Sequence, residues 1–361
     1  FLPIFVGCFF EGAVGEKYLN KGLAILDREL PEQFLPDGGH FELSPMYHCI
    51  LLFDVLDLVN LANISGNKEL VEQLERWRVI VRKALSWLKV MTHPDGEITF
   101  FNDATKGIAV TPDELISYAV SLNLVSDYSL KSIETLPDSG YTRISLPSYV
   151  AFFDHARIGP SYLPGHGHAD TLSVELSVGK ERVLVNSGTS VYGLSKERQR
   201  QRGTEAHNTV IVDSEDSSEV WGGFRVARRA TCKLIYTSET DEKIIIKAQH
   251  DGYKRLRRGT VHERELSSGL EALRIIDTLS GNYKTAYANY HLHPDVSLLV
   301  DSDKRLILNL KSGRSILVES SEIIEVFNTT WHPGFGVSIP NKCLRLPIKT
   351  GSLEISFSIC S

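Results

Sequence analysis

The stretch PGHGHADTLS, at positions 164–173, places His166, His168 and Asp170 within five residues. Imidazole and carboxylate groups transfer protons near neutral pH, and both also bind metal ions. An alternating apolar run follows the stretch, which predicts that it opens a β-strand. Residues two apart on a strand point to the same face, so we expect these three side chains to share one site.

Two further polar residues stand at the ends of later strand-like runs. Asn186 lies in LVNSGTSVYG, and His207 lies in AHNTVIVD. If these strand ends converge with His168 and Asp170, their nitrogen and oxygen atoms form a suitable donor set for a metal ion. A hydrogen-bonded polar cluster without a metal is the alternative.

A second group of candidates lies in DGGHFELSPMYH, at positions 37–48. Ser44 and Pro45 are typical of a helix start, which places the next residues in the first helical turn, facing the preceding loop. Simple capping and packing by the aromatic rings is the alternative. The candidates for substrate contact are His40, Glu42, Tyr47 and His48.

Basic residues gather in SKERQRQRG and FRVARR, at positions 195–203 and 224–229. If RQRQR is extended, its arginines lie on one side, where their planar forks suit carboxylate or sulfate groups. A solvated surface is the alternative. From this set we select Arg200 and Arg202 as candidates for substrate binding.

The elements that must position these residues divide the chain. Residues 1 to about 120 carry helical periodicity, notably at 16–34, 47–63, 67–91 and 111–120, which predicts a helical array or toroid. We expect a linker over 122–140. Short alternating runs then continue to the end and predict antiparallel sheets packed face to face. The expected domains are 1–135, helical, and 136–361, a β-sandwich.

The bulk properties restrict the function classes. With 361 residues the chain is long enough for about two domains. The formal charge of −6 argues against a nucleic-acid partner. No run of 18 consecutive apolar residues occurs, so we expect no transmembrane segment. FLPIFVGCFFEGAVG, the first fifteen residues, has the pattern of a helix that began earlier, which predicts a missing N-terminal part.

Four motifs in order, FELSPMYH, HGHADTLSVEL, VNSGTSVYG and EAHNTVIVD, resemble those of the heparinase II/III-like polysaccharide lyases, which are relatives of heparin-sulfate and alginate lyases. The resemblance implies an incomplete (α/α) toroid followed by an antiparallel β-sandwich. It also implies β-elimination at a 4-linked uronic acid in an acidic polysaccharide, with no cofactor required.

The resemblance also implies roles for individual residues. Tyr47 corresponds to the Brønsted acid, which in some relatives is also the base, and Tyr192 to an assisting tyrosine. His168 corresponds to the partner base or the group that neutralises the substrate carboxylate, and His166 is expected at the rim of the cleft. Members of the family also carry an asparagine on an earlier helix, which this chain lacks.

In some relatives a metal is held at the positions of Asp170, Asn186 and His207. Asn186 stands where those relatives have a carboxylate, so any zinc here is expected to be structural.

Two other functions remain open at this point. A non-catalytic glycan-binding protein of the same fold, acting in polysaccharide assembly or export, is consistent with the Asn186 change and the missing asparagine. A glycoside hydrolase needs two carboxylates flanking the cleaved bond, for which Glu42 and Asp170 are the candidates.

Overall fold

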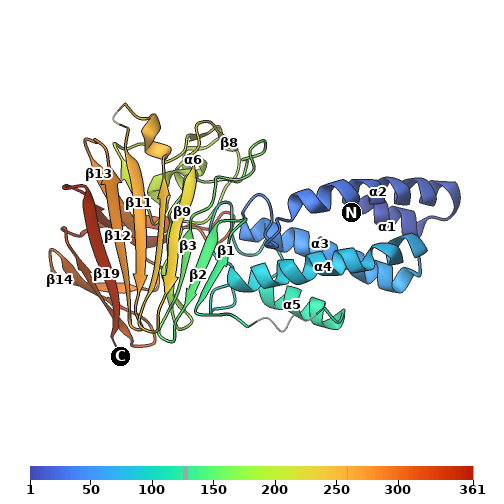
Figure 1. Cartoon of the computed structure of the whole chain (residues 1–361), viewed down its shortest axis with the longest axis horizontal. Coiled ribbons are helices and arrows are strands. Elements are labelled where there is room, and N and C mark those ends of the chain that lie inside the picture. Colours follow the sequence, from blue (N-terminus) through green and yellow to red (C-terminus); the bar gives the residue numbers. More distant parts are fainter. Residues whose placement is uncertain (125–128, 258, 361) are drawn as a thin grey trace.

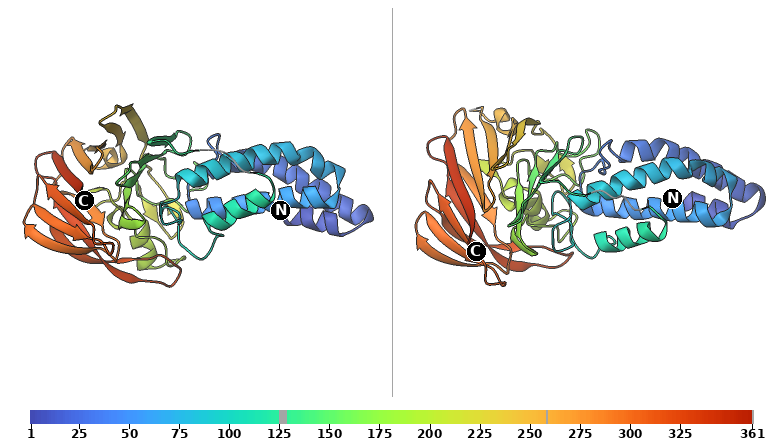
Figure 2. Two further views of the ribbon diagram at one scale, coloured as in Figure 1. Left: turned by 90° about the horizontal axis from the view of Figure 1, so that it is seen from below. Right: turned by 60° about the horizontal axis from the view of Figure 1, so that its bottom comes forward.

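The computed structural model describes residues 1–124, 129–257 and 259–360. The molecule is elongated, with helices at one end and stacked sheets at the other (Figure 1). Figure 2 shows the same division from two further directions, with the first four helices running side by side along the long axis.

The helices lie close to the predicted segments, and the chain caps them as expected. Ser44 caps α3 by accepting from the Tyr47 backbone N–H, and a capping box between Thr111 and Glu114 starts α5. The five helices of this half are α1 (Leu2–Phe9), α2 (Gly12–Gln33), α3 (Pro45–Ser65), α4 (Lys68–Val90) and α5 (Pro112–Ser121).

One expectation for the helical half needs correction. The first fifteen residues do not form one helix: the backbone turns extended at Phe10, and α1 packs back along α2. Also, α3 is long and apolar enough to cross a membrane by length and composition. Because residues such as Leu52, Val55 and Leu56 on α3 are fully buried in the helical core, the same apolar composition suits a core helix.

Within the described residues, the β half contains three larger sheets and a small hairpin, and the strands of each pair are antiparallel. The sheet nearest the helices runs in order β1 (Ile133–Leu136), β2 (Tyr141–Ser145), β3 (Val150–Asp154), β4 (Val174–Val178) and β5 (Glu181–Leu184). A second sheet consists of β17 (Glu325–Trp331), β18 (Ile339–Pro347), β13 (Ala286–His291) and β6 (Val210–Val212).

The largest sheet forms the outer wall of the β half in Figure 1. Its order is β14 (Ser297–Ser302), β15 (Arg305–Asn309), β16 (Ser315–Ser320), β19 (Ser352–Cys360), β12 (Ala272–Ser280), β11 (Val261–Ser268), β10 (Ile244–His250) and β9 (Cys232–Glu239). The hairpin pairs β7 (Val220–Trp221) with β8 (Arg225–Val226), and a short helix, α6 (Lys196–Arg202), lies beside it.

The predicted linker over 122–140 is only partly a linker. Its residues 125–128 lie outside the described part of the chain, but β1 forms within it and pairs in register with β2. The first sheet therefore begins before the expected boundary at 135/136. We propose that the boundary lies between the end of α5 at Ser121 and the start of β1 at Ile133.

Apolar packing joins the halves. The β core draws on all three large sheets, through residues such as Phe153, Leu266 and Leu344. The helical core extends into the β half, because Val185 and Trp331 are buried in the same cluster as the helix side chains. Shared burial of this kind fixes the helices against the sheets, so loops from both halves can build one site.

We predict that His155 links stability to pH. Burial lowers its pKa to about 4, and its Nε2 lies 2.8 Å from Thr142 Oγ1. Because the unfolded chain takes up this proton near its ordinary pKa of 6.5, the stability advantage of wild type over His155→Gln should be complete above pH 6.5. It should shrink by about 1.4 kcal/mol per pH unit as the pH falls towards 4. Urea unfolding of both proteins at several pH values measures this; a difference that does not change with pH would contradict it.

Candidate active site

The site is organised around Asp103, in the loop between α4 and α5. Its side chain is fully buried. Its carboxylate accepts hydrogen bonds from His166 Nδ1 and His168 Nε2, each at 2.8 Å, and from Thr189 Oγ1 at 3.1 Å. Arg198 donates through both terminal nitrogens, with Nη2 2.7 Å from Asp103 Oδ2. We call these five residues the Asp103 cluster.

The electrostatics of the Asp103 cluster favour an ionised carboxylate. Burial alone would raise the pKa of Asp103, but the hydrogen bonds from His166 and His168, together with the Arg198 guanidinium, hold it well below its usual range. A buried carboxylate is tolerable because all of these donors face it.

The backbone of Asp103 connects this cluster to the helix that carries Tyr47. Ser44 Oγ donates to the Asp103 carbonyl at 2.5 Å, while the same oxygen caps α3 by accepting from Tyr47 N. The Asp103 N–H in turn donates to the His166 carbonyl. The start of α3 and the 164–173 loop are therefore fastened to one residue.

Three side chains with proton-transfer chemistry meet beside the cluster. The hydroxyls of Tyr47 and Tyr192 are 3.0 Å apart, and the His166 ring lies 4.1 Å from the Tyr47 ring between centroids. Burial, as the first cause, raises the pKa of both tyrosines, and the Asp103 charge adds to the rise. Both phenols are therefore protonated at neutral pH and can donate.

His168 occupies a different environment from His166. The prediction that His166, His168 and Asp170 share a strand face is wrong, because they lie in the loop before β4. His168 is 1% exposed, its Nε2 is held by Asp103, and its Nδ1 is buried without a hydrogen-bond partner among the described residues. It does not reach the surface where a substrate would bind.

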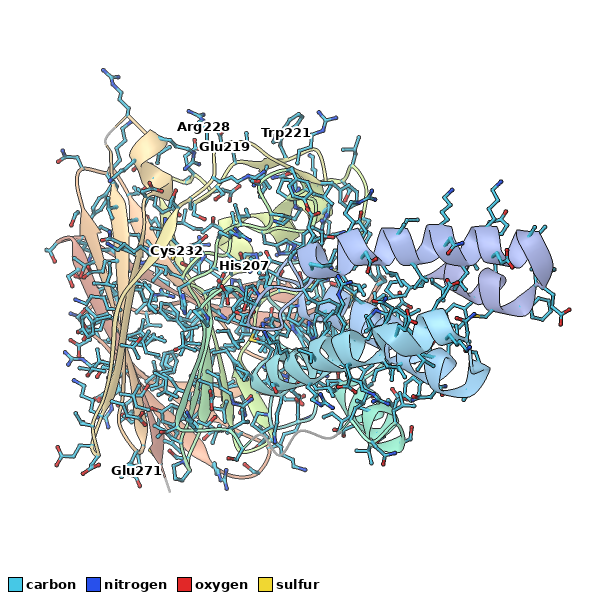
Figure 3. The ribbon with its side chains drawn as sticks, turned by 45° about the vertical axis from the view of Figure 1, so that its right-hand side comes forward. His207, Glu219, Trp221, Arg228, Cys232 and Glu271 are labelled. Carbon is cyan, nitrogen blue, oxygen red and sulfur yellow. The ribbon has the colours of Figure 1, made fainter. Side chains whose placement is uncertain are left out.

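His168 also belongs to a second group of side chains that could hold a metal ion. One ligand atom each from His168, Asp170 and His207 lies within 4.8 Å of the others. His207 Nε2 also lacks a partner within the described chain, and Asp170 Oδ2 accepts from the Asn102 N–H at 3.0 Å. Figure 3 shows His207 in the interior of the β half.

Hydrogen bonds fix the tautomers that this donor set needs. His168 Nε2–H must donate to the Asp103 carboxylate, and His207 Nδ1, 3.1 Å from Asn186 Oδ1, donates to that amide oxygen. Burial lowers the pKa of His168 to about 4 and that of His207 well below 6.5, so both rings are neutral at pH 7. The lone pair of each ring is therefore on the nitrogen that has no hydrogen-bond partner within the described chain. In metal sites, acceptors behind a ligating histidine fix its tautomer in the same way.

Asn186, predicted as a ligand, sits behind His207. Its Oδ1 accepts from Ser173 Oγ at 2.7 Å in addition to meeting His207, and its amide nitrogen donates to Glu175. Because these contacts occupy the Asn186 side chain, it lies beside the cluster and orients the His207 ring through a hydrogen bond.

Among the residues of the 37–48 loop, Glu42 and Tyr47 lie by the groove described below, whereas His40 and His48 do not. His48 Nε2 contacts the Ala84 carbonyl inside the helical core, and His40 is buried against Phe41. Burial lowers the pKa of both histidines to about 3. Neither is placed to contact a substrate.

The predicted one-sided display of arginines is also wrong, because RQRQR belongs to helix α6, which Ser195 caps. Arg202 is buried and donates to the Gly167 carbonyl. Arg200 pairs with Glu197 and donates to Thr330. Both arginines hold the local structure together and are engaged within the protein.

A groove of about 690 Å³ opens from His166 across the β7–β8 hairpin. Aromatic side chains form part of its wall, and Figure 3 shows Trp221 at the upper edge of the β half, on the side of the helices. The residues that line the groove include Glu42, Tyr162, His166, Trp221, Phe224 and Arg225.

Sequence reasoning missed Asp103 and the separate role of Arg198. The signal for Asp103 was the adjacent pair Asn102–Asp103 between apolar residues in FFNDATKG, where Asn102 adopts a positive φ of 57°. Arg198 was grouped with surface arginines because RQRQR gave no sign that one of them is buried.

Comparison with known proteins agrees with this architecture. The family model described as heparinase II/III-like, C-terminal, matches residues 129–358, and the heparinase II/III N-terminus model matches residues 4–122. The chain therefore belongs to the heparinase II/III-like family.

Similar proteins include a heparin-sulfate lyase of Bacteroides stercoris, 24% identical over 238 residues, which cover 59% of this chain and 34% of that protein. Among solved structures, a heparinase III gene product has a TM-score of 0.80 at 17% identity, and the heparan sulfate lyase of Pedobacter heparinus has 0.77 at 14%. Each aligns with 99% of this chain and with 58% of its own.

These matches establish the fold as an (α/α) toroid portion followed by an antiparallel β-sandwich, as the sequence predicted. The chain spans about a third of the curated relative and under two thirds of the solved ones.

Removing the charge of Asp103 should destabilise the fold. Asp103→Asn leaves the Arg198 guanidinium buried without its counter-ion, which we expect to cost roughly 3–5 kcal/mol of unfolding free energy. Urea denaturation measures the loss. Glu219→Gln, which breaks the exposed pair with Arg228, is the matched control and should leave the unfolding midpoint nearly unchanged. A similarly small effect of Asp103→Asn would contradict the account.

Proposed function

We propose that the protein is a polysaccharide lyase that cleaves a uronic-acid-containing chain by β-elimination. The observation that carries the proposal is the meeting of Tyr47, Tyr192 and His166 at the end of an aromatic groove, with the two hydroxyls 3.0 Å apart. Membership of the heparinase II/III-like family supports the same chemistry.

The reaction removes the C5 proton of a uronate and expels the oxygen attached at C4. The C5 proton is weakly acidic, so a base must lie close to it, and the departing oxygen must receive a proton. Tyr47 is protonated at neutral pH and partly exposed, which suits it to protonate the leaving oxygen. The hydroxyl of Tyr192 is placed to hydrogen-bond the substrate beside Tyr47.

We assign the base to His166 in place of His168. His166 donates from Nδ1 to Asp103, so in the neutral ring the lone pair is on Nε2. That atom faces the groove, 3.6 Å from Glu42 Oε2. His168 is buried with its Nε2 bound to Asp103, which supports a positioning and ligand role for it instead.

The substrate we propose is an acidic polysaccharide or oligosaccharide, as the names of the similar lyases suggest. The glycoside-hydrolase alternative needs Glu42 and Asp170 on either side of one bond. Asp170 lies buried in the histidine cluster and does not line the groove, which disfavours that alternative.

We also propose that His168, Asp170 and His207 hold a divalent cation such as zinc. Two buried imidazole lone pairs without partners within the described residues, and a nearby carboxylate, fit such an ion. The ion would supply structural cross-linking of the 164–173 loop to the segment at His207. Asn186 would orient His207 from behind.

The decisive test of the reaction is the ultraviolet absorbance of the unsaturated uronate product. Tyr47→Phe should reduce turnover by at least about a hundredfold, because the leaving oxygen loses its proton donor. Tyr118→Phe is the matched control: its hydroxyl contacts Asp57 away from the groove, and activity should persist.

The assay uses this chain against heparan sulfate, chondroitin, hyaluronan and alginate. Turnover by Tyr47→Phe at the wild-type rate would refute the role of Tyr47. Binding of an acidic glycan without formation of product would favour the non-catalytic glycan-binding function.

The metal proposal predicts that the purified chain supplied with zinc binds one ion and melts at a higher temperature. His207→Gln and Asp170→Asn should lose both effects, because the first removes an imidazole nitrogen donor and the second removes the negative charge of the carboxylate. His293→Gln, outside the cluster, should keep them. Zinc content by elemental analysis and melting curves give the answer; equal zinc binding by His207→Gln and wild type would rule the site out.

A further inference from the structure

The β7–β8 hairpin displays aromatic side chains at the rim of the groove. Trp221 is 49% exposed and Phe224 38% exposed, although large aromatic side chains are usually well buried. Both line the groove that ends at His166. Figure 3 shows Trp221 projecting from the upper edge of the β half. Exposed rings on a groove wall offer a flat surface for a ligand with an apolar face.

The hairpin is held firmly in place by helix α6. Gln199 Nε2 donates to the Val220 carbonyl at 2.6 Å, and Arg198 Nε donates to the Gly223 carbonyl at 2.9 Å. Gly223 has a φ of 77°, and a Cβ there would lie 2.5 Å from the Gly193 carbonyl oxygen, so the turn packs tightly against that loop. The exposed rings are therefore mounted on a fixed support.

Arg198 connects this support to the Asp103 cluster. The same guanidinium that pairs with Asp103 also lies over the Tyr192 and Phe224 rings, at 4.9 and 5.2 Å. The Phe224 ring in turn lies 5.3 Å from Tyr192 and 6.1 Å from His166. The hairpin surface thus continues directly into the group of acid and base residues.

Arg225 lies beside these rings and has no counter-ion among the described residues. Arg225 stacks its guanidinium 4.8 Å from the Trp221 ring centroid and makes no ion pair with any described residue. Arg228 pairs with Glu219 outside the groove. Arg229 lines the groove and also makes no ion pair with a described residue, but its guanidinium donates to the Pro160 and Ser161 carbonyls. The Arg225 fork remains available for a carboxylate or a sulfate.

Glu42, which also lines the groove, has a carboxylate oxygen, Oε2, that faces His166 Nε2 at 3.6 Å. Glu42 Oε2 is buried and has no hydrogen-bond partner within the described chain. Ligand hydroxyls would satisfy that oxygen. A cation without a counter-ion, an exposed indole and a carboxylate oxygen that accepts no hydrogen bond within the described chain line one groove. They match the three surfaces of an acidic sugar: its charged group, its apolar ring face and its hydroxyls.

We propose that the β7–β8 hairpin forms a binding subsite for an acidic sugar next to the bond that is cleaved, with Trp221 stacked on the pyranose ring and Arg225 paired with its carboxylate or sulfate. The proposal rests on the proposed function, since it names the substrate unit that the same groove recognises. It assigns specificity to Trp221 and Arg225, where the sequence had suggested Arg200 and Arg202.

The test measures binding by titration calorimetry in a Tyr47→Phe background, so that turnover plays no part. Acidic oligosaccharides from heparan sulfate, N- and O-desulfated heparan, hyaluronan and alginate are the probes. Trp221→Ala and Arg225→Gln should each weaken binding roughly tenfold. Trp221→Phe, which keeps a ring, should recover part of the loss.

Matched controls separate the subsite from general surface effects. Tyr236→Ala removes an exposed ring on β9, and Arg228→Gln removes a neighbouring arginine outside the groove. Both should bind within about twofold of the parent variant. Melting curves confirm that each variant is folded.

The outcomes distinguish the ligand group and the two proposals. A loss with Arg225→Gln on every probe identifies the carboxylate, and a loss confined to the sulfated probe identifies sulfate. Binding that depends on Trp221 and Arg225 while wild type yields no product would support the subsite and reject the lyase function. Unchanged affinity in Trp221→Ala and Arg225→Gln, or no binding of any probe, would overturn the subsite.

Discussion

The buried ion pair between Asp103 and Arg198 is the interaction on which the rest of the site depends. Two opposite charges with fully buried side chains must face each other, and this requirement brings the α4–α5 loop against α6. The Asp103 carboxylate also accepts hydrogen bonds from His166 and His168. Arg198 Nε, which does not contact Asp103, donates to the β7–β8 hairpin. One pair therefore sets the relative positions of the acid–base group, the buried histidine cluster and the groove wall.

The two histidines of the HGHAD sequence illustrate how a single carboxylate can prepare two rings for different tasks. Asp103 accepts from Nδ1 of His166 and from Nε2 of His168. The free lone pair is consequently on Nε2 of the first ring, which faces the groove, and on Nδ1 of the second, which faces Asp170 and His207. His166 lines the groove and His168 lies in the interior, although the two are only two residues apart and no strand is present there.

Much of the fold could be predicted from the sequence because helical and strand periodicities are strong in this chain. Ser44 marked the start of its helix correctly, and the helical segments expected at 67–91 and 111–120 correspond to α4 and α5. The errors arose where tertiary contacts override local pattern. RQRQR alternates like a strand, yet the Ser195 cap and the burial of Arg198 make it helical.

The site could be predicted only in part. Tyr47, Tyr192 and His166 were identified and do converge, whereas His40, His48 and Arg202 are polar residues that serve the core. Their sequence signals are the same, because burial depends on the packing of distant elements. Asp103 lies 63 residues from His166 along the chain, and no local pattern connects the two.

The central claim is that Asp103 fixes the ring of His166 with Nε2 free for proton abstraction. Nitrogen-15 NMR of the histidine side chains, with His166 assigned through His166→Gln, measures this directly at a pH where the ring is neutral. The account predicts the tautomer protonated on Nδ1, with its lone pair on Nε2. A neutral His166 protonated on Nε2, or an even mixture of tautomers, would contradict it.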